Sequence, residues 1–267
     1  MMPLESNILT IKGISVRFGG LQALNNIDIQ VDRNTVHGII GPNGAGKTTL
    51  FNVITGLIRS DSGTISLEGK ELPYVKPYQL VSLGFARTFQ NIRLFKEMSV
   101  LDNVMIGQHI RTPTPVFSIM INGKKSRHYE NVAKEKSLEA LKFMGIEKKA
   151  QETVSNLSYG QQKLVEFARA LAAQPKIILL DEPAAGMNPT EKANLLNIVD
   201  RLREKGYTII LIEHDMKLVM NICDMISVLD HGKVITQGRP EEVRNNKDVI
   251  SAYLGKGEYV NARNKRN

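Results

Sequence analysis

Residues 41–49, GPNGAGKTT, combine glycines with one lysine and two threonines, and these residue types bind phosphate. The spacing fits GxxxxGK[ST], which a random chain of this length matches with a chance of about 1%. Glycines let backbone N–H groups turn toward phosphate oxygens, and a helix N-terminus adds positive partial charge. The expected nucleotide-binding residues are Gly41, Pro42, Asn43, Gly44, Ala45, Gly46, Lys47, Thr48 and Thr49. Among them we expect Lys47 to reach the β- and γ-phosphates and the Thr48 hydroxyl to bind Mg²⁺.

Two adjacent carboxylates, Asp181 and Glu182, follow the apolar run Ile177 to Leu180. Ligands of open α/β sheets bind at the carboxyl ends of the strands. We therefore expect Asp181 to belong to the Mg²⁺ shell and Glu182 to act as the general base that orients and deprotonates an attacking water. The alternative is a solvated strand end with no catalytic role.

The elements that must position these groups alternate between strands and helices. Residues 36–40 predict a strand that leads into the phosphate loop, and residues 47–57 predict a helix after it. Continuous apolar runs at 177–180 and 208–212 are typical of strands buried on both faces of a parallel sheet. The helical pattern at 190–205 lies between those two runs, so a right-handed crossover in an α/β core is expected.

The middle of the chain differs, because residues 99–173 contain no convincing buried strand. Residues 137–144 and 163–173 predict helices, whereas two prolines make 111–123 a loop or irregular excursion. We therefore predict a helical subdomain inserted into the α/β core.

The predicted boundaries follow from this change of pattern. Residues 1–90 and 175–255 form an α/β nucleotide-binding core with a small antiparallel β lobe near the N-terminus, and residues 64–68 predict a short strand that enters a turn. Residues 91–174 form the helical subdomain, and residues 256–267 form a polar basic tail.

Composition excludes several protein classes. With 267 residues, 42% of them hydrophobic and 23% charged, the chain can bury a core and is not disordered throughout. We expect no membrane-spanning helix and no signal peptide, and the single cysteine, Cys223, excludes an internal disulfide framework and a cysteine-based zinc site.

The net charge of +8 is concentrated in two places, residues 111–149 with net +5 and residues 256–267 with net +3. Nucleic acid, an anionic membrane surface and an ordinary solvated surface are all compatible with this excess.

The hexapeptide at 157–162, LSYGQQ, together with the order of the elements, resembles the ATP-binding cassette (ABC) family, whose signature is LSxGQ. In that family the signature of one subunit completes the ATP site of another in a head-to-tail dimer. The resemblance thus implies that Ser158, Gly160 and Gln161 contact nucleotide. Read from the residues alone, Ser158 before a helix is more often a cap.

Three further positions are assigned by the same resemblance. Gln90, in RTFQNIRLF, stands at the Q-loop glutamine that contacts Mg²⁺ and senses the transmembrane partner. His214, in LIEHDM, stands at the switch histidine that contacts the γ-phosphate, and Phe18 stands at the aromatic residue that stacks on adenine. The alternatives without a binding role are that His214 is a structural histidine and that Phe18 is an ordinary core phenylalanine.

One position departs from the family pattern, since Asn188 in PAAGMNP stands where many members carry the D-loop aspartate. An amide can still hydrogen-bond across a dimer but cannot form an ion pair. The resemblance also places a groove for a short permease helix at residues 90–108, and we expect Phe95 on its floor with Arg93 and Lys96 at its rim.

Longer strings narrow the resemblance. ARTFQNIRLFKEMSVLDNVMIGQH, LSYGQQKLVEFARAL and DEPAAGMNP are similar to ATPase subunits of bacterial branched-chain (hydrophobic) amino-acid importers, and the excursion at 111–129 is similar to the longer of their two subunits. The resemblance implies ATP and Mg²⁺ as ligands. It also implies separate membrane permeases, a second ATPase in a heterodimer and, indirectly, a periplasmic binding protein. The expected location is the cytoplasmic face of the inner membrane, and no nucleic-acid partner is expected.

Three rivals remain. The first is a motor of the same fold for another cargo, such as urea or lipopolysaccharide. The second is a soluble ABC ATPase that acts on DNA or ribosomes, against which stands the lack of long heptad runs and of a second cassette. The third is a different phosphate-loop NTPase such as a GTPase, against which stand the signature segment and His214.

Overall fold

The computed structural model describes residues 7–88, 90–108 and 123–254. The chain divides into two compact units: unit 1 comprises residues 1–77 and 199–267, and unit 2 comprises residues 78–198. The expected α/β fold class is confirmed by the mixture of sheets and helices described below. The domain boundaries from the sequence stay a prediction. The basic tail and nearly all of the proline-containing excursion lie outside the described residues.

Unit 1 contains the predicted antiparallel β lobe. Its strand order is β2-β1-β4-β5. The strands are β1 (Asn7–Phe18), β2 (Leu21–Asp32), β4 (Ser62–Leu67) and β5 (Lys70–Leu72). Along much of β1 and β2, buried apolar residues alternate with more exposed residues that are mainly polar, as expected for strands with one face on a core.

The same unit holds the strand that carries the phosphate loop. Strand β3 (Val36–Ile40) is buried at all five residues and pairs in parallel with β8 (Thr208–Ile212) and β9 (Met225–Asp230). Strand β10 (Lys233–Gly238) pairs antiparallel with β9. The helices of this unit are α1 (Lys47–Ile54), α8 (Met216–Ile222), α9 (Pro240–Asn245) and α10 (Lys247–Leu254).

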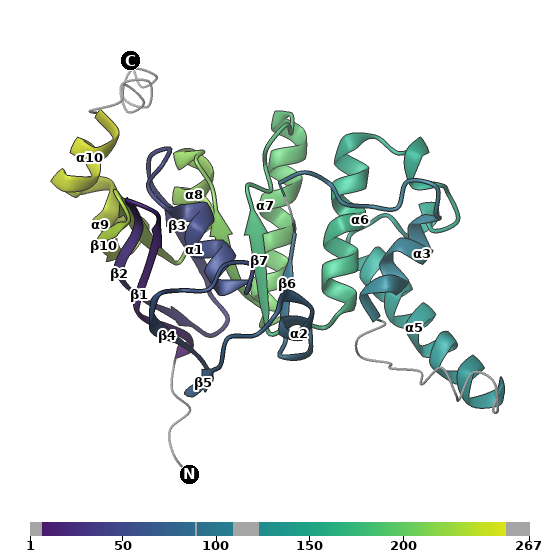
Figure 1. Cartoon of the computed structure of the whole chain (residues 1–267). Helices are drawn as coiled ribbons and strands as arrows, with labels where there is room; N and C mark the ends of the chain where they lie inside the picture. The colour runs from purple at the N-terminus through teal and green to yellow at the C-terminus, as the bar shows by residue number, and fades with distance from the viewer. Residues whose placement is uncertain (1–6, 89, 109–122, 255–267) are drawn as a thin grey trace, which may run out of the picture. The chain divides into compact units, whose positions relative to one another are not determined.

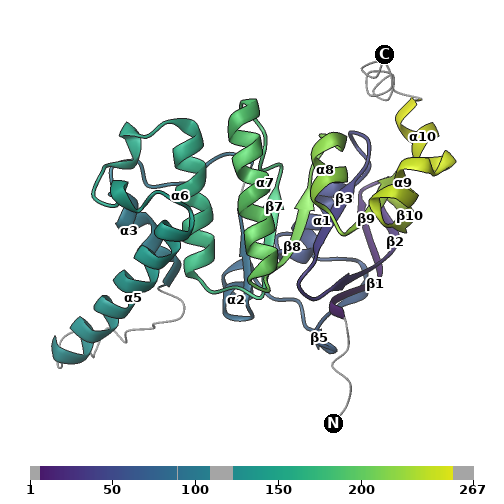
Figure 2. The ribbon, with the colours of Figure 1, turned by 180° about the vertical axis from the view of Figure 1, so that it is seen from behind.

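Unit 2 combines two parallel strands with a group of helices. Strand β6 (Phe85–Arg87) pairs with β7 (Ile177–Asp181). Helices α3 (Val100–Met105), α5 (Gly123–Phe143) and α6 (Tyr159–Ala172) contact one another, as both views show (Figures 1 and 2). Helix α2 (Pro77–Ser82) precedes β6, and helix α7 (Pro189–Glu204) follows β7.

Two predicted helices are longer in the structure. Helix α5 begins at Gly123 rather than at residue 137, and its side chains from Arg127 to Asn131 are all exposed, so this part has no apolar periodicity to read. Helix α6 begins at Tyr159 rather than at residue 163, which places most of the signature segment inside the helix.

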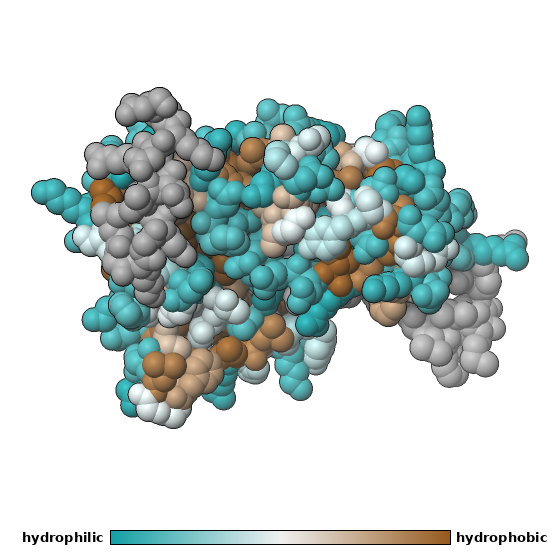
Figure 3. Space-filling model, turned by 90° about the horizontal axis from the view of Figure 1, so that it is seen from above, coloured by the Kyte–Doolittle hydropathy of each residue, from teal (hydrophilic) through white to brown (hydrophobic). Residues whose placement is uncertain are grey.

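Short 3₁₀ turns occur at Ile106–Gln108, Glu147–Lys149 and Val154–Asn156. Within the described part of the chain, no helix combines the length and the apolar character that crossing a bilayer requires. Seen from above, hydrophilic residues cover most of the visible face, and the hydrophobic ones form separate patches (Figure 3).

Candidate active site

The phosphate loop connects β3 to α1 in unit 1 and depends on the backbone of Gly46. This residue precedes the helix with φ 104° and ψ 0°, which is left-handed backbone that other residues rarely adopt. A Cβ atom there would lie 2.8 Å from the carbonyl oxygen of Ala23. Only glycine therefore fits where β2 approaches the loop.

Lys47 is buried, and its ammonium lies inside the loop. Its Nζ donates hydrogen bonds to the carbonyl oxygens of Gly41 at 2.6 Å and Pro42 at 3.0 Å. The carbonyl oxygens of the loop thus fix the lysine side chain. Its positive charge lies close to the N-terminal end of α1.

The loop fits a polyphosphate. Asn43 and Gly44 are exposed at its tip, and Thr48 in the first turn of α1 is exposed as well. The first N–H groups of a helix have no partner within the helix, and the first turn of α1 contains no acidic residue to neutralise them. The amide donors of the first turn, a helix dipole and a lysine therefore favour an anion at this place.

His214 and Phe18, also in unit 1, are both available at the surface. The His214 side chain is 62% exposed just after β8, while the neighbouring Glu213 is buried and accepts the His214 backbone N–H at 3.1 Å. Phe18 ends β1 and is 49% exposed, so it is not a core residue. The roles assigned to both side chains by resemblance stay predictions.

In unit 2 the predicted metal ligand Asp181 and the predicted general base Glu182 each contact a side chain from the segment that begins with β6. Arg87 Nη2 donates to Asp181 Oδ2 at 2.7 Å, and Gln90 Nε2 donates to Glu182 Oε2 at 2.8 Å. The parallel pairing of β6 with β7 explains this, because it places Arg87, the last residue of β6, opposite Leu179, two residues before the end of β7 at Asp181.

Glu182 has an unusual backbone conformation. Its φ is 45°, in the left-handed region where a glutamate is uncommon. Its carbonyl oxygen accepts the N–H of Ala185 at 3.1 Å and so begins the turn after β7. Such backbone conformations concentrate at functional sites.

The signature segment forms a capping box at the start of α6. The Ser158 hydroxyl accepts the Gln161 N–H at 3.3 Å, and the Gln161 side-chain oxygen accepts the Ser158 N–H at 3.2 Å. The simple reading of Ser158 as a cap is thus correct for this chain. The first turn of α6 contains no acidic residue, so its exposed end keeps the partial charge that an anion requires.

Gly160 packs against the start of α7. A Cβ atom at Gly160 would lie 2.3 Å from Glu191 Oε1, so a larger residue would displace this glutamate. Glu191 in turn accepts the Asn188 N–H at 3.0 Å, and the Asn188 side-chain oxygen accepts the Glu191 N–H at 2.9 Å. The departure at Asn188 therefore has a local role, because its amide oxygen caps α7.

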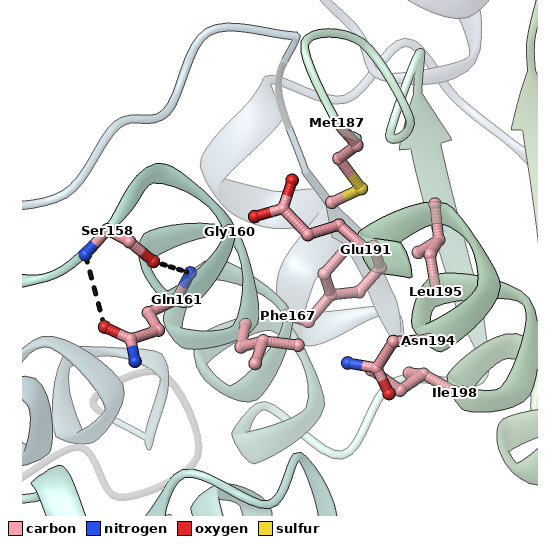
Figure 4. A pocket seen from close by; sticks show the side chains of 10 residues that line it. Ser158, Gly160, Gln161, Phe167, Met187, Glu191, Asn194, Leu195 and Ile198 are labelled. Carbon is pink, nitrogen blue, oxygen red and sulfur yellow. Dashed lines mark hydrogen bonds between the residues drawn. The ribbon is translucent and has the colours of Figure 1, made fainter. Parts of the chain in front are cut away.

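A pocket of about 140 Å³ lies between the starts of these two helices (Figure 4). Its walls are mainly apolar, with Ser158 and Glu191 among the polar groups at its edge. The signature segment and the loop after β7 are therefore in direct contact within one unit.

Three residues of this region were missed by sequence reasoning: Arg87, Lys163 and Glu191. Glu191 could have been found, because Asn, Pro and Glu at 188, 189 and 191 match a capping box with proline at the first helical position. The i, i+3 spacing of Lys163 and Glu166 indicates an ion pair but not its burial. Arg87 carried no local signal.

The candidate Mg²⁺ ligands have suitable chemistry. Thr48, Gln90 and Asp181 offer a hydroxyl, an amide and a carboxylate oxygen, and hard oxygen donors suit Mg²⁺. Among the described residues no group of three or more His, Cys, Asp or Glu side chains could hold a metal by itself. Mg²⁺ usually keeps several waters and binds substrate phosphates together with one or two carboxylates, so this set of donors suits its chemistry.

Comparisons with known proteins agree with this geometry. A family model described as "ABC transporter" matches residues 24–185, and one described as "Branched-chain amino acid ATP-binding cassette transporter" matches residues 233–259. The chain is 43% identical to the high-affinity branched-chain amino acid transport ATP-binding protein LivG of Escherichia coli over 93% of this chain and 98% of that protein. It is 42% identical to the corresponding protein BraF of Pseudomonas aeruginosa, with the same coverage. A crystal structure of a nucleotide-free ATP-binding cassette from an ABC transporter superposes with a TM-score of 0.81 at 37% identity, covering 94% of this chain and 100% of that one.

Proposed function

The chain belongs to the ABC transporter family, and we propose that it is the ATP-hydrolysing motor subunit of a bacterial importer for branched-chain amino acids. It is an ATPase that converts ATP and water to ADP and phosphate. The family model for the branched-chain type at residues 233–259 and the 43% identity to LivG support this cargo class. The chain itself contains no group that we assign to an amino acid.

The observation that carries the proposal is the position of Lys47. A buried ammonium inside a glycine loop, at a helix start without acidic neighbours, gives a charge-assisted donor for the β- and γ-phosphates. The Phe18 ring supplies an exposed aromatic face for the adenine, and the exposed imidazole of His214 supplies a donor for the γ-phosphate.

Unit 2 supplies the general base. Glu182 accepts the proton of the attacking water at its carboxylate, and Gln90 fixes the orientation of that carboxylate through its amide. Thr48, Asp181 and Gln90 are the residues that we propose hold Mg²⁺, which when bound supplies positive charge at the phosphates.

We further propose a head-to-tail dimer in which Ser158, Gly160 and Gln161 complete the site of a second ATPase subunit. Closure of the dimer on ATP and its reopening after hydrolysis drive separate permease subunits. This motor acts at the cytoplasmic face of the inner membrane as a peripheral subunit, and a periplasmic binding protein delivers the amino acid to the permease.

The dimer is tested with mixed dimers. Ser158→Arg in one subunit and Lys47→Ala in the other damage one shared site if the signature acts across the dimer, so the second site stays whole and some activity is expected to survive. If each subunit used its own signature, both sites would be damaged and ATP turnover would be lost.

The cargo is tested by purifying the tagged chain with its membrane partners and reconstituting the complex in liposomes. Leucine, isoleucine or valine with the matching binding protein is expected to raise ATP turnover, whereas urea and lipopolysaccharide are not. Stimulation by either of the latter would support the rival transporters. Co-purification with ribosomes or DNA and without a permease would support the non-transport rival.

A further inference from the structure

Helix α6 contains a buried ion pair close to the signature segment. The side chains of Lys163 and Glu166 are each 1% exposed, and Lys163 Nζ lies 3.3 Å from Glu166 Oε2. Burying an ammonium and a carboxylate costs several kcal/mol for each ion, and such pairs are often no more stable than apolar replacements. Stability alone therefore does not explain why these charges are placed here.

Lys163 has a second acceptor outside its own helix. Its Nζ donates to the backbone carbonyl oxygen of Gln90 at 3.1 Å. Gln90 is exposed, lies between β6 and α3, and belongs to no helix or strand. A charged donor that binds a carbonyl of such a segment fixes the backbone where regular structure does not.

The side chain of the same glutamine reaches Glu182. Gln90 Nε2 donates to Glu182 Oε2 at 2.8 Å, so a continuous set of hydrogen bonds runs from Lys163 through Gln90 to the candidate general base. Lys163 follows Ser158 by five residues in the same helix, whose backbone bonds make it a rigid element. The position of the signature helix and that of the Glu182 carboxylate are therefore linked within unit 2.

We propose that Lys163 is a positioning residue for Glu182: it holds the Gln90 backbone to helix α6, so that Glu182 is aligned for catalysis only while the signature helix occupies this position. The inference rests on the proposed roles of Gln90 and Glu182. It implies that nucleotide bound at the signature segment of this subunit influences the general base of the same subunit. The two composite sites of the dimer would then be coupled through Lys163.

The test removes both charges together, because Lys163→Met alone would leave Glu166 buried without its ammonium. The variant Lys163→Met/Glu166→Leu keeps similar side-chain volumes and removes both members of the buried ion pair. In the assembled transporter we expect kcat to fall roughly 10- to 100-fold, because small misplacements of catalytic groups cost that much. ATP affinity and melting temperature of the full chain are expected to stay near those of the unmodified protein.

The matched control is Glu166→Gln, which removes the carboxylate but keeps Lys163 beside the Gln90 carbonyl. Because this variant also leaves a buried charge without its ion-pair partner, its melting temperature is measured together with kcat, and in the folded variant kcat is expected to be near normal. If Lys163→Met/Glu166→Leu does not fold, Lys163→Gln/Glu166→Gln serves the same purpose, because a glutamine is too short to replace the lysine at Gln90. Unchanged kcat in a folded double variant overturns the proposal, as does an equal loss in Glu166→Gln.

A structural role and a positioning role are separated by adding Gln90→Ala. If Lys163 acts through Gln90, the loss of kcat in Gln90→Ala is not increased further by the Lys163→Met/Glu166→Leu change. If instead the fold-losses in kcat of the two changes multiply, Lys163 acts through a group other than Gln90, and the proposal is overturned. Glu182→Gln is measured alongside: normal turnover in that variant rejects the proposed general base itself, which is a different failure.

Discussion

Arg87 Nη2 lies 2.7 Å from Asp181 Oδ2, so the carboxylate predicted to serve Mg²⁺ is ion-paired to the last residue of the neighbouring strand. Both side chains are mostly buried. Strand β6 therefore has two roles: it pairs with β7, and its last residue, Arg87, neutralises the charge of Asp181 at the end of β7.

This ion pair should be energetically significant. In a double-mutant cycle with Arg87→Met and Asp181→Asn, measured by urea unfolding, we expect a coupling free energy of about 1–3 kcal/mol, since the low exposure reduces solvent screening. The same cycle at Arg33 and Glu68, whose side chains are about a third exposed, is the control and should give under ~1 kcal/mol. Equal coupling at the two pairs would contradict this expectation.

Glu182→Gln should leave ATP binding intact and reduce turnover by about 100-fold or more, because the amide is similar in size but cannot accept the proton of water. Steady-state ATPase assays with the permease present measure this. Glu204→Gln, an exposed change at the end of α7, controls for the loss of one negative charge. Near-normal ATPase in Glu182→Gln would rule out this general base.

Lys47→Ala should weaken ATP binding at least about tenfold and abolish hydrolysis, because the loop loses its buried charge-assisted donor. Calorimetric titration with ATP measures the affinity. Lys12→Ala removes the same charge from the exposed side of β1 and should bind ATP normally. Unchanged affinity in Lys47→Ala would exclude this loop as the nucleotide site.

His37 should make folding stability depend on pH. Burial lowers the pKa of this histidine from 6.5 to about 4, and its Nε2 lies 2.8 Å from Ser227 Oγ. The unfolded chain takes up the proton first as the pH falls, so stability is complete above pH ~6.5 and is lost progressively toward pH ~4. Between pH 7 and 5 the loss from this group should be about 2 kcal/mol.

Urea unfolding at both pH values measures that loss. His37→Gln, which can still hydrogen-bond to Ser227, should lose about 2 kcal/mol less over the same range. An identical pH dependence in the two proteins would show that His37 does not titrate in this way.

Phe95→Ala should separate assembly from ATP binding. The Phe95 side chain is 55% exposed, while Asn103 binds the backbone on both sides, accepting the Phe95 N–H at 2.8 Å and donating to its carbonyl at 2.9 Å. The ring is therefore presented outward on a fixed backbone, between the exposed residues Arg93 and Lys96.

In that variant we expect unchanged ATP affinity and melting temperature, with reduced permease pull-down and reduced transport. Tyr78→Ala, another exposed aromatic residue of unit 2, should assemble normally. Early melting of Phe95→Ala would indicate a packing role, and normal assembly would exclude the groove.

Much of this site could be predicted because its signals are local. The phosphate loop and the two carboxylates each follow a continuous apolar strand, so their place at a strand end can be read directly. The contacts made by Arg87 and Lys163 could not be read in this way. They depend on the pairing of a three-residue strand with β7 and on the packing of α6 against an irregular segment.

The helix boundaries show the same limit. The start of α5 was missed because exposed turns carry no apolar pattern, and the start of α6 was missed because glycine at position 160 is a weak helix former. The capping box at Ser158 decides the start of α6, and its partner Gln161 was interpreted only as a ligand residue.

The pairing of β3 also has a consequence for biosynthesis. Val36 pairs with Ile209 and His37 with Met225, so the partners of this buried strand leave the ribosome about 170 to 190 residues after it. At roughly 5–20 residues per second this is a delay of about 10–35 s. Unit 2 is one continuous segment, residues 78–198, and can acquire its contacts during that time. The nascent chain must therefore keep the apolar strand β3 without its native strand partners throughout this delay.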